Sequence, residues 1–503
     1  MIPIEKQLCC MKRTISLIFA VSLFLTGYSK SKVLITGQIA DTSSLEVVYS
    51  VPLNGTCFFR DTLQADNTGN FQLKLDIVQP AFVQLRTANS QKQVRLLIEP
   101  NEKYHVILSK ENKAEISGSN AKGQLWYNSL PAPDFIEEEG KSFRNDTSLA
   151  IIQEKIAQLK HSDLENLQQL LEEQAISSTF FQLAKNDRDC YYASLEARTL
   201  LIKFYNYIPR TADEALSESG KELLKRLGDI YARYSPNDKA LLASPFWGEY
   251  AEYYLGDYLL LGQLTQENGF QQLKEIAQLY QNGQGNTLVF AESKKHLTGA
   301  VREFFQAKTL LYVGSQMNYE KELIPLFAQF QKDYPKSAYT PYLQPEMDAV
   351  TRYHQVIENP FDATIQFVDN YAEINTLEEA IRTVKGKKIY IDIWATWCGP
   401  CKKEFAYNKA LSKLLAEKDI QQLYISIDKP NAEEKWKENI KFYHLEGSHI
   451  LANQSLETDL RKRYDKKKGE TIAIPWYILV DENGTIIEEH AKSPAKLVAR
   501  DYP

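Results

Sequence analysis

Three patterns of hydrophobic and polar positions follow one another along this chain. From Val33 to about Ile116, hydrophobic residues alternate with polar ones, most clearly in the stretch Phe71–Ile77. This period of two is typical of strands that bury one face. Short turn sequences rich in Asn, Gly and Pro separate the alternating stretches. The first pattern therefore predicts a β-sandwich domain over residues 32–118.

In the second pattern, hydrophobic residues recur three and four positions apart, as at Leu149, Ile152 and Ile156. This spacing places them on one face of a helix and predicts an all-α helical domain over residues 121–360. An aromatic residue also recurs at every fourth position in one stretch: Phe246, Tyr250, Tyr254 and Tyr258. Such a stripe fits either a peptide-binding groove or packing between helices, and we favour packing.

In the third pattern, apolar stretches alternate with amphipathic ones, which is typical of an α/β domain and predicts one over residues 361–503. Four stretches carry this prediction: a buried strand at Ile389–Ile393, a helix at Pro400–Ala416, and the hairpin strands Trp476–Val480 and Thr485–Glu489. The hairpin is predicted because Asn483-Gly484 lies between its two strands.

Composition narrows the function classes. The chain has 503 residues, of which 44% are hydrophobic and 25% charged, as in an ordinary globular protein. Its net charge of −6 lacks the basic character of a nucleic-acid binder, so we expect no nucleic-acid partner. Six Cys are too few for a scaffold held together by disulfides.

The N-terminus predicts export. Lys12 and Arg13 precede the apolar run Ile15–Thr26, which is too short to span a bilayer and fits a signal peptide over residues 1–31. An uncleaved anchor is the alternative interpretation. A bacterial lipobox would carry its lipid on a Cys at position 28, but the chain has Tyr28 there. We therefore expect a soluble exported protein of the periplasm or cell envelope.

Two cysteines, Cys398 and Cys401, are separated by two residues directly after the predicted buried strand. This spacing at the start of a helix is typical of a dithiol redox site. The helix N-terminus favours an anion, so the pKa of the Cys398 thiol should fall and its thiolate should be the nucleophile. For the same reason we expect Cys398 to be partly exposed. Pro400 suits the first helical turn because it has no N–H group to leave unpaired.

A zinc site or a fixed disulfide is the structural alternative. Zinc needs two further ligands, but Cys57 and Cys190 lie far away in the other two zones. His444 and His449 are not spaced as a zinc pair, and we predict that both lie on the surface. We therefore expect no bound metal.

The segment IDIWATWCGPCKKEF, residues 391–405, resembles the thioredoxin superfamily, in the extracytoplasmic branch of thiol–disulfide oxidoreductases that includes TlpA and ResA. The resemblance extends from Phe361 to the end of the chain and implies a thioredoxin-like fold. It also implies disulfide exchange in which Cys398 attacks a substrate disulfide and Cys401 resolves the mixed disulfide, leaving a Cys398–Cys401 redox disulfide. The alternating N-terminal zone resembles the small β-domain of unknown function that precedes such domains in many Gram-negative envelope proteins.

The same resemblance implies how the substrate is held. Ile474-Pro475-Trp476 matches the cis-proline loop of the family, which predicts a cis Ile474–Pro475 bond close to Cys398. The backbone of Ile474 would then pair with an extended substrate segment. The predicted substrate-binding residues are Trp397, Gly399, Pro400, Ile474 and Pro475.

Two acidic residues are candidates for proton transfer. Asp392 lies in the apolar strand before the motif, where burial should raise its pKa to suit a general base for Cys401. It also matches the buried aspartate of thioredoxin, although a strand residue with local hydrogen bonds is the alternative. Glu404 lies three residues after Cys401 on the predicted helix, as either a second relay or an exposed helical residue.

One position departs from the family pattern. Ala406 stands where thioredoxin-like domains usually carry a Pro that kinks the helix, so we expect a straighter helix here.

Two functions fit these observations. One is an exported oxidoreductase that reduces disulfides of envelope proteins. The other is an envelope binding or scaffold protein in which the helical domain is the working part. No glycine-rich nucleotide loop precedes the dithiol, so we expect no cofactor and a separate membrane thiol-reductant donor that recharges the protein.

Overall fold

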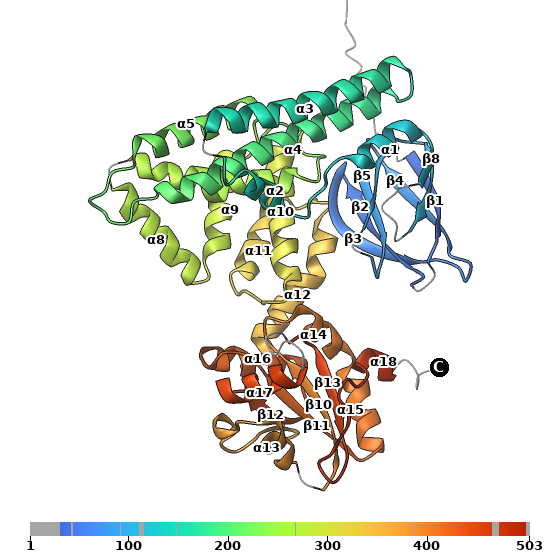
Figure 1. Cartoon of the computed structure of the whole chain (residues 1–503), viewed down its shortest axis with the longest axis vertical. Coiled ribbons are helices and arrows are strands. Elements are labelled where there is room, and N and C mark those ends of the chain that lie inside the picture. The colour runs from blue at the N-terminus through green and yellow to red at the C-terminus, as the bar shows by residue number, and fades with distance from the viewer. Residues whose placement is uncertain are drawn as a thin grey trace, which may run out of the picture.

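The computed structural model describes residues 31–498, apart from 42–43, 91, 110–114, 147, 267, 385 and 465–471. Residues 1–30 of the expected signal peptide, Tyr28 among them, lie outside the described residues. Figure 1 shows a group of strands followed by a group of helices, and a mixed group below them. Within the described part of the chain, no helix combines the length and the apolar character needed to cross a bilayer.

The strands of the N-terminal group, which we call the β-region, form two four-stranded sheets with the orders β4-β1-β7-β8 and β3-β2-β5-β6. Their bounds are β1 (Ser31–Ile39), β2 (Glu46–Leu53), β3 (Thr56–Gln64), β4 (Asn70–Ile77), β5 (Ala81–Thr87), β6 (Val94–Ile98), β7 (Lys103–Leu108) and β8 (Glu115–Gly118). Buried side chains of both sheets share one hydrophobic core. Every second residue of β4, beginning with Phe71, is buried, as the alternating pattern predicts.

The central group, which we call the helical region, is built from helices and short helical turns. Its elements are α1 (Ala121–Ser129), α2 (Ile136–Ser142), α3 (Leu149–Glu172), α4 (Ser178–Phe204), η1 (Tyr205–Tyr207), α5 (Glu218–Arg233), α6 (Trp247–Glu252), η2 (Tyr253–Tyr258), α7 (Leu259–Leu261), η3 (Gly262–Thr265), α8 (Gly269–Gln281), α9 (Gly285–His296), α10 (Gly299–Ser315), α11 (Leu323–Asp333) and α12 (Thr340–Val356). The helices α3, α4 and α5 each begin after a Ser whose hydroxyl accepts a hydrogen bond from a backbone N–H of the first turn.

The aromatic stripe of the helical region packs inside it. The Tyr231 ring of α5 lies 5.1, 4.9 and 5.0 Å from the ring centres of Tyr250, Tyr254 and Tyr258. Phe246 and Tyr250 are buried in the core of this region. The prediction that the stripe serves packing between helices is confirmed.

The C-terminal group, which we call the α/β region, has a six-stranded sheet in the order β14-β13-β10-β11-β12-β9. Its elements are β9 (Ile365–Phe367), η4 (Tyr371–Glu373), α13 (Leu377–Arg382), β10 (Lys388–Trp394), α14 (Gly399–Glu404), η5 (Phe405–Tyr407), α15 (Asn408–Glu417), β11 (Ile420–Ser426), η6 (Pro430–Ala432), α16 (Glu433–Tyr443), β12 (Gly447–Leu451), α17 (Gln454–Tyr464), β13 (Trp476–Val480), β14 (Ile486–Glu488) and α18 (Pro494–Val498). Strands β10, β11, β12 and β9 pair in parallel, whereas β13 pairs antiparallel with both β10 and β14.

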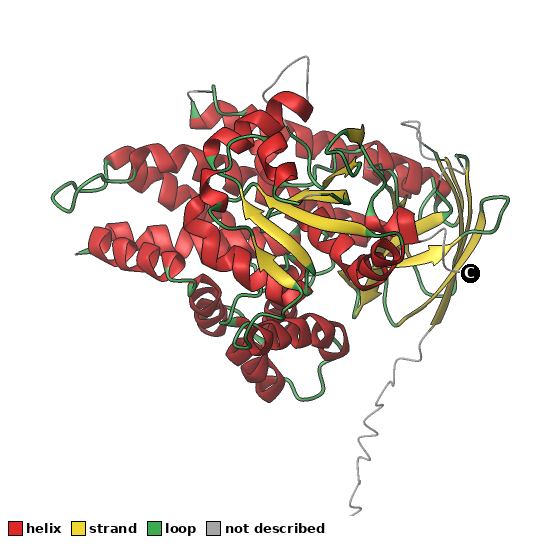
Figure 2. Cartoon of the chain, turned by 90° about the horizontal axis from the view of Figure 1, so that it is seen from below, coloured by secondary structure: helices red, strands yellow, loops and turns green. Residues whose placement is uncertain are grey.

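The central strand β10 is buried on both faces of this sheet. Ile389, Ile391 and Ile393 share a core with residues of α13, α16 and α17. Tyr390 packs on the other face with residues of α15 and β13. Figure 2 shows the strands of this sheet flanked by helices. Successive residues of a strand point to opposite faces, so β10 supplies hydrophobic side chains to both layers.

The helix after the dithiol differs from the predicted one. The sequence predicts one straighter helix over Pro400–Ala416, because Ala406 replaces the usual Pro. The structure instead has α14, the 3₁₀ turn η5 and then α15. Within η5, the ring of Phe405 lies 5.2 Å from that of Trp394 and 5.1 Å from that of Tyr443. Packing of this ring therefore accompanies the break in the helix without a Pro.

The helical region contacts the α/β region beside the dithiol. Lys402, in α14, donates a hydrogen bond of 2.8 Å to the carbonyl of Met317. The hydroxyls of Tyr319 and Tyr443 lie 2.5 Å apart. Tyr353 of α12 donates a bond of 2.9 Å to a carboxylate of α16. The first contact joins α14 to the segment between α10 and α11, and the other two join α16 to that segment and to α12.

Candidate active site

Cys398 and Cys401 form a disulfide at the start of α14, with their Cα atoms 5.3 Å apart. The Cys401 N–H donates a hydrogen bond of 3.1 Å to Cys398 Sγ, so Cys398 caps the helix. The sequence predicts a partly exposed Cys398, but only 4% of the residue is exposed because it packs into the core of the α/β region. The adjacent Trp397 is 64% exposed.

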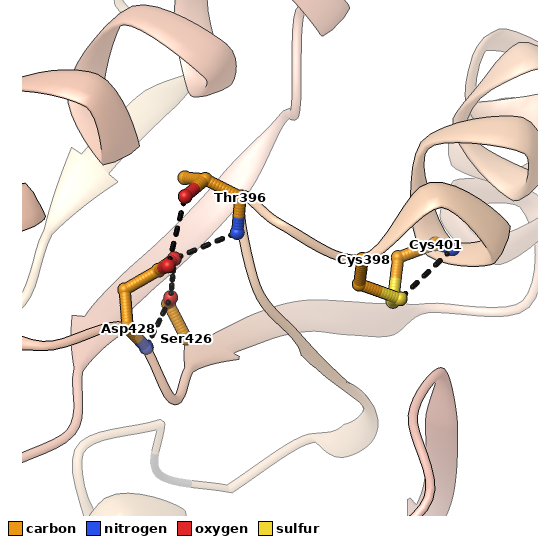
Figure 3. The surroundings of a disulfide bond; sticks show 5 residues. All are labelled: Thr396, Cys398, Cys401, Ser426 and Asp428. Carbon is orange, nitrogen blue, oxygen red and sulfur yellow. Dashed lines mark hydrogen bonds between the residues drawn. A yellow bond between two sulfur atoms is a disulfide. The ribbon is translucent and has the colours of Figure 1, made fainter. Parts of the chain in front are cut away.

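A buried carboxylate braces the loop that leads to the disulfide, as Figure 3 shows. Asp428 accepts hydrogen bonds of 2.8 Å from both the N–H and Oγ1 of Thr396. It accepts a third, of 2.6 Å, from Ser426 Oγ. All three residues are buried. These hydrogen bonds, which we call the Asp428 brace, fix the backbone of Thr396, two residues before Cys398.

Sequence reasoning missed this brace. Thr396 follows β10 and Asp428 follows β11, and the two strands pair in parallel with Trp394 opposite Ser426. Only that register brings the two strand ends together. A polar residue at the end of a buried parallel strand is the signal that points to such a site.

Asp392 lies on β10, between Tyr424 of β11 and Tyr477 of β13. Burial raises its pKa well above the ordinary value, and the charge of Glu404 raises it further. Its Oδ1 is buried without a hydrogen-bond partner among the described residues. The raised pKa brings this carboxyl group closer to the pKa of a thiol, as proton transfer between the two groups requires.

Glu404, the second acidic candidate, has a structural partner. One of its carboxylate oxygens accepts a hydrogen bond of 2.9 Å from the N–H of Ala495, in the first turn of α18. A carboxylate at this position satisfies a free N–H of that helix.

Lys402 directly follows Cys401 and is 3% exposed. Burial lowers its pKa to about 8, with repulsion from Lys435 adding to the effect and Asp428 opposing it. A buried ammonium group thus lies in the same helical turn as Cys401.

The predicted substrate-binding residues lie in two segments. Trp397 and Pro400 are exposed, and Gly399 between them is half-buried. The Ile474–Pro475 bond is cis, as predicted. It immediately precedes Trp476, which pairs with Ile393 at the end of β10 that leads to the motif. Contact between Pro475 and Cys398 stays a prediction.

The remaining candidate ligands lie apart from this site. Cys57 and Cys190 are free thiols, and burial raises their pKa values to about 11 and about 12. The prediction that His449 lies on the surface is wrong. It is buried, its ring stacks on Tyr424 at 4.9 Å, and its Nε2 lies 2.8 Å from the Leu445 carbonyl. Strand β12, which carries it, is an inner strand of the sheet.

Across the described residues, no group of three or more His, Cys, Asp or Glu side chains is placed to hold a metal ion.

Comparisons with known proteins match the part of the chain that carries the disulfide. The Redoxin family model matches residues 370–498. Thiol-disulfide oxidoreductase ResA of Bacillus thuringiensis subsp. konkukian (strain 97-27) is 26% identical over 122 residues, which cover 24% of this chain and 65% of ResA. Thioredoxin-like protein YneN of Bacillus subtilis (strain 168) is 25% identical over 122 residues, with the same two coverages. The chain thus spans 65% of the length of these curated relatives.

Solved structures are similar over the same share of the chain. The solution structure of a thiol:disulfide interchange protein from Bacteroides sp. is 22% identical, with a TM-score of 0.20. The similarity covers 25% of this chain and 74% of that one.

Proposed function

The C-terminal part of this chain, residues 370–498, belongs to the thioredoxin superfamily in its TlpA/ResA-like branch, and from this premise we propose that the protein is a thiol–disulfide oxidoreductase that reduces disulfides of envelope proteins. The observation that carries the proposal is the Cys398–Cys401 disulfide at the start of α14, with Cys398 as the helix cap. This is the oxidised form that a dithiol reductase reaches at the end of its reaction.

The reaction begins from the reduced dithiol. The Cys398 thiolate attacks one sulfur of a substrate disulfide, forms a mixed disulfide and releases the other substrate sulfur as a thiolate. Cys401 then loses its proton to Asp392 and attacks Cys398 Sγ. The second substrate thiolate leaves, and Cys398 and Cys401 are joined. The substrate gains two electrons, which the dithiol loses.

Substrate binding uses the exposed rim of the site. Trp397, Gly399 and Pro400 offer an apolar surface beside the disulfide, and the Ile474 backbone offers an N–H and a C=O for strand-like pairing with a substrate segment. Pro475 directs that backbone toward Cys398. The Asp428 brace keeps the Thr396 backbone in place while the disulfide opens and closes.

The cellular setting belongs to the same proposal. The exported chain consists of a signal peptide (1–31), a β-sandwich domain (32–118), an all-α domain (121–360) and a thioredoxin-like domain (361–503). It acts in the periplasm or cell envelope as a soluble protein, because Tyr28 offers no thiol for a lipid. A membrane thiol-reductant donor restores the Cys398–Cys401 dithiol after each turnover.

Reduction of insulin disulfides by the full chain tests this function. With dithiothreitol as electron source, the wild-type protein should accelerate insulin precipitation, and Cys398→Ser should abolish the acceleration. Cys401→Ser should instead trap a mixed disulfide on Cys398, visible as a mass increase that a reductant removes. A wild-type protein without activity would reject the enzyme and favour the scaffold function of the helical domain.

A further inference from the structure

A cavity of about 260 Å³ lies between the β-region and the helical region, away from the dithiol. Cys57 and Phe58 of β3 and Arg95 of β6 line it from the β-region. Glu249 of α6 and Lys308 of α10 line it from the helical region. The volume approaches the lower end of the range for small-molecule pockets, about 300–1,000 Å³. Its mixed charged and aromatic lining is typical of a ligand site.

Lys308 forms no hydrogen bond or ion pair within the described residues. Its ammonium group lies beside Gly248 and 5.9 Å from the centre of the Phe304 ring. Burial lowers its pKa, although the charges of Cys57, Glu252 and Glu249 oppose this. An ammonium group in such surroundings is stabilised by any anion that enters the cavity.

The backbone of α6 makes room for this ammonium group. Gly248 is the second residue of α6. A Cβ atom at this position would fall on Lys308 Nζ and crowd its Cε and Cδ. The glycine therefore allows the Lys308 side chain to lie against the helix.

Arg95 and Glu249, two other charged side chains of the cavity wall, form hydrogen bonds within the protein. Arg95 donates hydrogen bonds of 2.7 and 2.8 Å to the carbonyls of Tyr127 and Leu130. The Glu249 carboxylate accepts bonds of 3.1 and 3.2 Å from the Ile136 N–H, and one from the Tyr253 hydroxyl. Among the described residues, the half-buried Lys308 and the Nη1 group of Arg95, which is buried without a hydrogen-bond partner, are thus cationic groups of the wall left to bind a carboxylate.

We propose that this cavity is a binding site for a small organic carboxylate with an apolar body, whose carboxylate pairs with Lys308 and whose body lies against the rings of Phe58 and Phe246. Both rings line the cavity. The bound molecule would touch the β-region and the helical region at once. The site is independent of the dithiol, and so its test is independent of the proposed reductase activity.

Cys57 provides a reporter inside the cavity. Its thiol lines the wall, whereas Cys190 is fully buried outside the lining, and the oxidised Cys398–Cys401 pair cannot be alkylated. Phenylacetate, the carboxylate probe, should slow the labelling of Cys57 by N-ethylmaleimide in the oxidised full chain. The neutral probe 2-phenylethanol, of similar size, should leave the labelling rate unchanged. Peptide mass mapping measures the labelling.

Binding of phenylacetate to variants, measured by titration calorimetry or ligand-observed NMR, locates the carboxylate contact. Lys308→Met should weaken binding about tenfold or more, because a charge-assisted hydrogen bond is lost. Gly248→Ala keeps the charge but displaces it, and should also weaken binding. Lys332→Met, on the exposed side of α11, is the matched control and should bind as the wild type does.

Three results would overturn the proposal. These are no binding of phenylacetate at millimolar concentration, equal binding of 2-phenylethanol, and equal binding by the wild type and Lys308→Met. If Lys308→Met does not fold, an unchanged affinity of Gly248→Ala for phenylacetate would overturn the proposal instead.

Discussion

The carboxylate of Asp428 binds Thr396 twice, through the Thr396 N–H and its Oγ1, at 2.8 Å each. These residues are 32 positions apart in sequence, and both are buried. The pair joins the loop that carries Cys398 to the end of the neighbouring strand.

Replacing Asp428 with Ala should destabilise the oxidised protein by about 1–3 kcal/mol, because the buried Thr396 N–H and hydroxyl lose their acceptor. Urea unfolding followed by tryptophan fluorescence measures this change. Asp369→Ala, at an exposed position, is the control and should stay within about 0.5 kcal/mol of the wild type. Equal stability of the two variants would mean that the brace contributes nothing to the fold.

After reduction, Cys398 should be the first cysteine to be alkylated. Burial holds the pKa values of Cys57 and Cys190 at about 11 and about 12, so both remain thiols at pH 6. Cys398 lies at a helix N-terminus, which favours its thiolate. Brief treatment with iodoacetamide at pH 6 and peptide mapping should find label on Cys398. Preferential label on either of the other two would contradict its assignment as nucleophile.

Replacing Asp392 with Asn should slow resolution of the mixed disulfide by about a hundredfold, because the general base is lost. Stopped-flow measurement at neutral pH would follow release of the second substrate thiol. Glu404→Gln is the matched control, because the Glu404 carboxylate already binds the Ala495 N–H. If both variants slow resolution equally, the two acids act together. If neither does, Asp392 has only a structural role.

Asp392→Asn should also change the pH dependence of the free energy of unfolding. The folded-state pKa of Asp392 is raised by burial, so the folded state retains a proton that the unfolded state loses above about pH 3.9. The contribution of Asp392 to the free energy of unfolding is therefore largest below that pH and falls as pH rises through the folded-state pKa. Asp392→Asn should be more stable than the wild type at neutral pH, and the gain should disappear near pH 3.5. Urea unfolding across this range measures the difference.

His449 should make the protein sensitive to acid. Burial lowers its pKa to about 4, whereas the ring in the unfolded chain titrates near 6.5. The contribution of this neutral ring to the free energy of unfolding is fully present above about pH 6.5 and should fall by about 3 kcal/mol as pH drops to about 4. His449→Phe should lose less stability over this interval, and the exposed His444→Phe should behave as the wild type. An identical acid response of all three proteins would exclude this cause.

The sequence correctly predicted those elements that are determined by residues close to one another in the chain. The alternation around Phe71, the dithiol after an apolar strand and the hairpin at Asn483-Gly484 each depend on neighbouring residues. The cis bond before Pro475 followed from the family resemblance.

Features set by contacts between distant segments were missed. Asp428 meets Thr396 because β10 and β11 pair in one register, and periodicity does not state which strands pair. His449 is buried because β12 lies inside the sheet. The break at Ala406 accompanies ring packing between Phe405 and Tyr443, which belong to separate helical segments.

The contact between Lys402 and the Met317 carbonyl has a consequence for the size of substrates. Because the helical region rests against the turn that carries Cys401, a folded partner must fit beside that region before its disulfide can reach Cys398. A small disulfide such as oxidised glutathione has no such steric requirement. The helical region would then restrict which proteins can reach the redox centre according to their shape. Small disulfides would not be restricted in this way.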